Sequence, residues 1–204
     1  MPKPKNPFAP EGVRPPNTFV PALGSNPTVH EHHHTVTPLT GDIVYRFAGD
    51  RVLAGSGVFM LDIDGSGKSE VGFEYRWLTV GDQTELALVV ETHQAGRILM
   101  TGDKAPALRA EGDTITSNSA SPLSWASGVT TMASRATVDG NPGPWSGPWV
   151  GANKGYLGLE IATDEGTRLG WIRLSVEASN GHLTVHGYAY RLTPGAEIVA
   201  GQES

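Results

Sequence analysis

The sequence of 204 residues contains no cysteine. This absence excludes disulfides, zinc–thiolate sites, iron–sulfur clusters and a cysteine nucleophile together. The sequence also lacks any run of about 18 apolar residues, which a membrane-spanning helix requires. Charged residues make up 18% of the chain and give a formal net charge of −6, whereas surfaces that bind nucleic acid are basic. We therefore expect no transmembrane segment and no nucleic-acid partner.

Local catalytic motifs are absent as well. The sequence has no Gly-x-Ser-x-Gly elbow, phosphate-binding loop, dinucleotide fingerprint or His-Glu-x-x-His pair. Glu160, Asp164 and Glu165 are neighbours in sequence, and a glycan hydrolase needs two facing carboxylates. However, residues 162–167 have the composition of a hairpin turn, which would leave these carboxylates in solvent. The sequence therefore predicts a non-enzymatic protein with no catalytic residue and no organic cofactor.

Glycine and proline, in contrast, are abundant, with 26 and 15 residues. Nine of the prolines lie within residues 1–38, where they prevent a helix or a central strand. The apolar residues of this segment are too scattered to form a core of their own. We predict an extended Pro/His-rich arm that docks along a groove or sheet edge of a protein partner or of a second copy of the chain. The alternative is a linker that binds nothing.

Residues 39–204 are predicted to form a single all-β domain, an antiparallel β-sandwich or jelly roll, because short apolar–polar alternations are separated by turn residues throughout. The predicted strands are 42–47, 51–54, 57–62, 71–80, 84–91, 96–101, 156–162, 169–178 and 182–191. A short helix is expected only around residues 119–127. The residues predicted for the core are Phe73, Tyr75, Trp77, Leu159, Ile161, Trp171, Ile172 and Tyr190.

A glycine-bent acidic segment, residues 62–70, is the most informative stretch for chemistry. Oxygen ligands at alternating positions can wrap a hard cation such as calcium, and Gly65 and Gly67 allow the tight turns that this requires. The segment is not an EF-hand, since Phe73 stands where the bidentate glutamate belongs. The alternative is a polar Asp-Gly hairpin turn. The predicted calcium ligands are Asp62, Asp64, Ser66, the Lys68 carbonyl and Glu70.

A histidine cluster within the arm is a second candidate metal site. In an extended chain His30, His32 and His34 lie on one face, and neutral imidazoles bind copper, nickel or zinc. The alternative is a polar strand that resembles an affinity tag by chance.

Five tryptophans raise the question of a sugar-stacking surface. Trp145 and Trp149 lie in a Pro/Gly-rich loop where a ring could be exposed, whereas Trp77 and Trp171 lie in strand-like runs, and Trp125 fits either role. We favour packing over carbohydrate binding.

Several short motifs resemble uncharacterised exported β-rich bacterial proteins, some of which carry PEP-CTERM sorting tails. The motifs are Tyr156-Leu-Gly158, Gly170-Trp171 and Ala189-Tyr190, with an upstream Asp-x-Asp-Gly turn at Asp62–Gly65. The resemblance spans about residues 42–202, but no sorting tail follows Ser204 and the arm has no counterpart. It implies export and a β-rich fold, and no reaction.

The N-terminal residues have no apolar stretch and do not form a signal peptide as written. Together with the resemblance, this leads us to expect an extracellular or cell-surface protein whose signal is not in the sequence shown. The predicted function is a non-enzymatic structural or interaction subunit of a larger assembly, docking through its arm and stabilised by calcium. The alternatives are a calcium-stabilised carbohydrate-binding module and, third, a glycan hydrolase.

Overall fold

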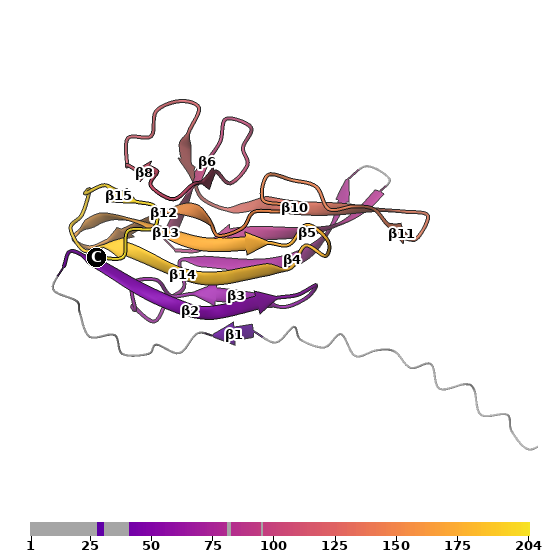
Figure 1. The fold of residues 1–204 in the computed structure, drawn as a ribbon, viewed down its shortest axis with the longest axis horizontal. Helices are drawn as coiled ribbons and strands as arrows, with labels where there is room; N and C mark the ends of the chain where they lie inside the picture. Colours follow the sequence, from indigo (N-terminus) through magenta and orange to yellow (C-terminus); the bar gives the residue numbers. More distant parts are fainter. Residues whose placement is uncertain (1–27, 31–40, 81–82, 95) are drawn as a thin grey trace, which may run out of the picture.

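The structure, a computed structural model, describes residues 28–30, 41–80, 83–94 and 96–204. It is all-β, and the described residues contain no helix. Two sheets lie face to face as a β-sandwich (Figure 1), as the sequence predicts. Among the described residues we find no helix that could span a membrane.

The first sheet has six strands in the order β1–β3–β4–β5–β10–β11. Apolar and polar side chains alternate along β4, because one face packs on the core and the other faces outward, whereas β5 is buried on both faces from Leu86 to Val90. The short strand β1 pairs with β3 in parallel, whereas the other neighbours in this sheet are antiparallel. The strands are β1 (Thr28–His30), β3 (Val58–Leu61), β4 (Val71–Val80), β5 (Gln83–Thr92), β10 (Val129–Val138) and β11 (Asn141–Pro142).

The second sheet follows the order β2–β14–β13–β12–β6–β9, with a further short strand, β7, paired to β12. A separate two-stranded sheet joins β15 to β8. The strands are β2 (Ile43–Leu53), β6 (Gly96–Met100), β7 (Leu108–Arg109), β8 (Thr114–Ile115), β9 (Ser124–Ala126), β12 (Gly155–Thr163), β13 (Gly166–Val176), β14 (Leu183–Arg191) and β15 (Ile198–Val199).

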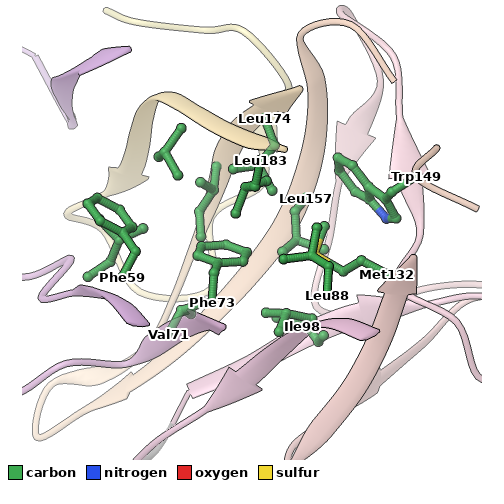
Figure 2. Packing of buried hydrophobic residues seen from close by; sticks show 14 of the residues in the cluster. Phe59, Val71, Phe73, Leu88, Ile98, Met132, Trp149, Leu157, Leu174 and Leu183 are labelled. Atoms are coloured by element: carbon green, nitrogen blue, oxygen red, sulfur yellow. The ribbon is translucent and has the colours of Figure 1, made fainter. Parts of the chain in front are cut away.

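The main core lies between the two sheets, and side chains of both meet there (Figure 2). Phe73 and Leu88 come from the first sheet, and Leu157, Leu174 and Leu183 from the second. Burial of this apolar surface is the dominant favourable contribution to folding.

A second, smaller core covers part of the outer face of the second sheet. Trp171 is fully buried there, with the Tyr156 ring edge-on at 5.2 Å and Tyr45 tilted at 5.9 Å. Ile115 and Ile198, from the two-stranded sheet, belong to the same cluster. The central strands are therefore buried on both faces, which explains why the adjacent residues Trp171 and Ile172 are both inaccessible.

Seven of the eight predicted core residues are buried, and the prediction for Trp77 is wrong. Trp77 lies on the same face of β4 as Phe73 and Tyr75, but its side chain is 66% exposed. Alternation identifies the face of a strand and not where its neighbouring strand ends. Strand β3 pairs with β4 only up to Glu74, so Trp77 lies where β4 is an edge strand, and its ring is open to solvent.

Two secondary-structure predictions are also wrong. The expected turn at Gly49-Asp50 is a bulge inside one continuous strand, β2, that joins two strands predicted separately. The expected helix around residues 119–127 is a turn followed by β9, which pairs with β6; Pro122 lacks the N–H that a helix interior needs. Of the predicted arm, the backbone of Thr28–His30 forms β1, and residues 1–27 and 31–40 lie outside the described part of the chain.

Candidate metal centre

The acidic loop, residues 62–70, connects β3 to β4 and is folded around the carboxylate of Asp62. The N–H of Gly65 donates to Asp62 Oδ1 at 2.8 Å, and the N–H of Gly67 donates to Oδ2 at 2.7 Å. Both glycines have left-handed backbone angles, with φ of +81° and +84°, which a residue with a Cβ adopts only at a cost. The N–H of Ser66 donates to Asp64 Oδ1 at 2.9 Å. These local bonds fix the curve of the loop and the position of both aspartates.

Glu70 closes the base of the acidic loop. Its N–H donates to the Leu61 carbonyl at 3.0 Å, and its Oε2 accepts the Ile63 N–H at 2.7 Å. The residue is 4% exposed, so its carboxylate sits at the edge of the core. Gly96 packs directly against it, because a Cβ on Gly96 would lie 2.6 Å from the Glu70 carbonyl oxygen.

The carboxylates of Asp62, Asp64 and Glu70 converge, with one oxygen of each lying within 4.8 Å of the others. Burial, together with the negative charges of Asp64 and Asp62, raises the pKa of Glu70 to about 7, against the opposing effect of the hydrogen bond from the Ile63 N–H. A buried carboxylate beside two like charges is unfavourable unless a proton or a cation neutralises it. The loop is therefore arranged as a set of oxygen ligands whose repulsion a cation would relieve.

An open hollow of about 590 Å³ lies beside this group. Asp64 and Glu70 line it together with Ser66 and Lys68, and Asp164 borders it from the β12–β13 turn. The structure thus brings all five predicted residues to one place, and coordination of calcium by them stays a prediction. The oxygen-only donor set suits a hard cation such as calcium.

The other carboxylates considered from the sequence do not form a facing pair. Glu160 is buried and bonded to Arg97 at 2.7 Å, and Glu165 is paired with Arg168 in the turn. Both are neutralised by arginine.

The histidine cluster falls largely outside the described residues. His32 and His34 lie in the segment that the structure does not describe, and for His30 only the backbone is described. The transition-metal site at His30, His32 and His34 stays a prediction.

The tryptophans of the Pro/Gly-rich loop are packed. Trp149 is fully buried and donates from Nε1 to the Pro106 carbonyl at 2.9 Å. Trp145 is 8% exposed, lies edge-on to Tyr75, and is covered by the Arg135 guanidinium at 5.2 Å. Packing is therefore confirmed for these two rings.

Sequence reasoning missed a second polar cluster, which we call the serine cluster: Ser175, His186 and Asp50. Ser175 Oγ lies 2.8 Å from His186 Nε2, and His186 Nδ1 lies 2.6 Å from Asp50 Oδ1. The residues come from β13, β14 and β2, and 136 positions separate the histidine from the aspartate. No local motif contains all three, and only the pairing register of the strands could have indicated the cluster.

Comparison of the chain with protein-family models, with curated proteins and with solved structures gave no match. The acidic loop and the serine cluster are therefore the features of the molecule that bear on its function.

Proposed function

We propose that the protein is an interaction subunit whose β-sandwich is stabilised by calcium bound in the acidic loop. The observation that carries this proposal is the position of Glu70, a carboxylate that is 4% exposed and grouped with Asp62 and Asp64 within 4.8 Å. In the absence of a cation this burial is costly, and in its presence the same three groups supply negative oxygen ligands on a prefolded loop. Calcium suits this site better than a transition metal because no nitrogen or sulfur ligand belongs to the group.

The loop also explains how the cation would act on the fold. It joins β3 to β4 within the first sheet, and Glu70 directly precedes β4. A cation held between Asp62 and Glu70 would tie the two ends of the loop together and so favour the folded state. If the cation binds the folded chain alone, the free energy of unfolding rises by about 2.7 kcal/mol when free calcium reaches 100 times its dissociation constant.

Calorimetric or fluorescence melting in chelator and in increasing free calcium tests the proposal. The full chain should melt at a higher temperature with calcium, and Glu70→Gln should abolish the response while Glu197→Gln, an exposed carboxylate in a different turn, keeps it. A parallel magnesium titration separates a specific site from general screening of charge. An unchanged melting temperature from chelator to millimolar calcium would reject the site.

Docking through residues 1–38 is the second part of the proposal. The composition of this segment supports it, since nine prolines reduce the entropy lost when the chain is ordered on a partner. The native mass of the full chain is compared with that of a chain lacking residues 1–38. We expect the shortened chain to fold and to lose association; a shortened chain that associates normally would reject the role of the arm. The resemblance to exported β-rich proteins supports an extracellular or cell-surface location.

One observation favours carbohydrate binding as a second candidate function. The Trp77 ring is 66% exposed on a strand, and exposed indole faces stack on sugar rings. Quenching of tryptophan fluorescence by oligosaccharides, and its loss in Trp77→Ala, would support this candidate.

A further inference from the structure

The serine cluster is a continuous chain of hydrogen bonds across three strands of the second sheet. His186 is 9% exposed, and its two ring nitrogens contact Ser175 Oγ at 2.8 Å and Asp50 Oδ1 at 2.6 Å. A serine, a histidine and an aspartate in this order form the nucleophile, base and orienting group of acyl-transfer enzymes. The alternative is a group of polar side chains on the surface of the sheet without a catalytic role. The hydrogen-bond donors and acceptors and the backbone around the cluster bear on this choice.

When His186 is neutral and Asp50 is ionised, the hydrogen bonds fix the tautomer. The Asp50 carboxylate can only accept, so the His186 proton lies on Nδ1 and the lone pair of Nε2 faces Ser175. The N–H of Lys154 donates to Ser175 Oγ at 2.9 Å. Ser175 therefore accepts from Lys154 and donates its hydroxyl proton to His186, which is the state that a base-activated nucleophile requires.

The backbone is distorted at the point where the cluster forms. In the pairing of β14 with β2, Val185 lies opposite Arg51 and Gly187 opposite Phe47, so His186 faces three residues of β2. The pairing of β14 with β13 also shifts register at His186. Asp50, inside this bulge, has a φ of +51°, a left-handed conformation that aspartate adopts more readily than most residues. Bulges redirect side chains and occur often beside active sites.

Ser175 and His186 are accessible from an open hollow of about 400 Å³. Ala152, Asn153, Ala178 and His182 also line it. Val52 lies two strands away from Ser175, because Thr184 pairs with Ser175 on one side and with Val52 on the other. Its apolar side chain is 60% exposed. The site thus combines a serine hydroxyl hydrogen-bonded to a histidine with a small open hollow, whose volume suits a short acyl group.

We propose that Ser175 is the nucleophile of a site that hydrolyses short-chain carboxylic esters. Ser175 Oγ attacks the ester carbonyl carbon while its proton passes to His186 Nε2. The carbonyl π electrons move onto the oxygen, and the Asn153 amide, on a residue that lines the hollow, is the donor we assign to it. The ester C–O bond then breaks, and the alcohol leaves with the proton from His186.

Water completes the reaction. It attacks the acyl-Ser175 ester and gives a proton to His186, and collapse of the intermediate releases the acid as the proton returns to Ser175 Oγ. Asp50 holds the histidine in the correct tautomer throughout and acts as a positioning residue. This activity goes beyond the proposed interaction function and requires no cation.

A fluorophosphonate probe tests the proposal on the full chain, followed by peptide mapping with mass spectrometry. Ser175 Oγ should displace fluoride from phosphorus and form a stable adduct at Ser175, and the rate of adduct formation should fall about 10²- to 10⁴-fold in His186→Ala. Hydrolysis of p-nitrophenyl acetate by the same preparations should be lost in Ser175→Ala and kept in Ser56→Ala, an exposed serine in another turn.

Two results would overturn the proposal. One is the absence of a Ser175 adduct in chain that circular dichroism shows to be folded. The other is ester hydrolysis by folded Ser175→Ala at the rate of the unmodified chain. Should His186→Ala fail to fold, Asp50→Asn replaces it, since the Asp50 side chain is 61% exposed and slower labelling is expected there too; equal labelling in that variant counts against the cluster.

Discussion

The acidic loop and the serine cluster each gather three functional side chains, and they do so in opposite ways. In the acidic loop all three carboxylates come from nine consecutive residues, and the bonds that shape the loop join residues two to seven positions apart. In the serine cluster the contacts span 11 and 136 positions, and they exist because β14 pairs with both β2 and β13, with a register shift at His186 in each pairing.

The two regions also differ in charge. The acidic loop collects like charges, and burial raises the pKa of Glu70 to about 7, so the region needs a proton or a cation from outside. In the serine cluster each donor meets an acceptor, so it is satisfied within the chain. The acidic loop could therefore be recognised from neighbouring residues in the sequence. The serine cluster could not, because its residues meet only through the pairing of β2, β14 and β13.

The largest expected effect on stability follows removal of Trp171, the central side chain of the smaller core on the outer face of the second sheet. Trp171 is fully buried between Tyr45 of β2 and Tyr156 of β12, so Trp171→Ala should lower the free energy of unfolding by about 3–5 kcal/mol. Urea denaturation measures this change. Trp77→Ala is the control, because its ring is 66% exposed and its effect should stay within about 0.5 kcal/mol. Similar losses in both variants would contradict the burial difference.

The next effect concerns the acidic loop and pH. Folded Glu70 keeps its proton up to a pH of about 7, whereas its ordinary pKa is 4.5. Between these values the folded state binds more protons than the unfolded state, so stability falls as pH rises. At about 1.4 kcal/mol for each pKa unit, the chelated protein should lose about 3 kcal/mol between pH 4.5 and 8.

Denaturation in chelator across this pH range checks the prediction. Glu70→Gln should flatten this part of the pH dependence, and Glu197→Gln should leave it unchanged. Calcium at pH 8 should restore the stability of the unmodified chain by favouring ionised Glu70. The same slope in Glu70→Gln would show that other groups cause the pH dependence.

A smaller effect is expected where the register itself is disturbed. A Cβ on Gly187 would lie 2.8 Å from the Arg46 carbonyl oxygen and 3.0 Å from the Tyr45 hydroxyl, so Gly187→Ala must shift β14 against β2. We expect a loss of about 1–3 kcal/mol and slower labelling of Ser175, with the calcium-induced increase in melting temperature retained. Gly41→Ala is the control, because the nearest atom to its Cβ would be 4.0 Å away. Loss of the calcium response in Gly187→Ala would mean that the two regions are coupled.

The smallest change in stability is expected for Asp50→Asn. Asparagine tolerates the left-handed backbone, and the side chain is 61% exposed, so the free energy of unfolding should change by about 0.5 kcal/mol or less. Labelling of Ser175 should nevertheless slow, by less than in His186→Ala, because an uncharged amide orients the imidazole weakly. Unchanged labelling would assign Asp50 to surface solvation alone.

Much of the β-sandwich can be predicted from the sequence, because strands buried on one face alternate visibly. The predicted range of β4 matches the structure, and β12, β13 and β14 differ by a few residues at their ends. Strand β10 was not predicted: small and polar residues dominate it, and a register shift at Met132 interrupts its alternation. Trp77 was misplaced because the sequence does not show that the neighbouring strand β3 ends its pairing with β4 at Glu74.

The same distinction applies to the functional residues. Asp62, Asp64 and Glu70 could be grouped in advance because the loop that joins them is short. Ser175, His186 and Asp50 could not, since their contact depends on a bulge in β2 that the sequence presents as a turn at Gly49-Asp50. A difference of one residue in pairing would move His186 to the other face of the sheet.

The parallel pairing of β1 with β3 has a consequence for any molecule that approaches this side of the first sheet. Thr28, Val29 and His30 lie beside Val58, Phe59 and Met60, so the chain occupies its own sheet edge with part of its own arm. A strand from another chain can add to β3 only after these three residues leave, and a partner that removes them uncovers the β3 edge. The free energy of the β1–β3 pairing therefore lowers the affinity of a strand that adds to β3. It lowers equally the affinity of a partner that binds the arm, so shortening or strengthening β1 would change both affinities together.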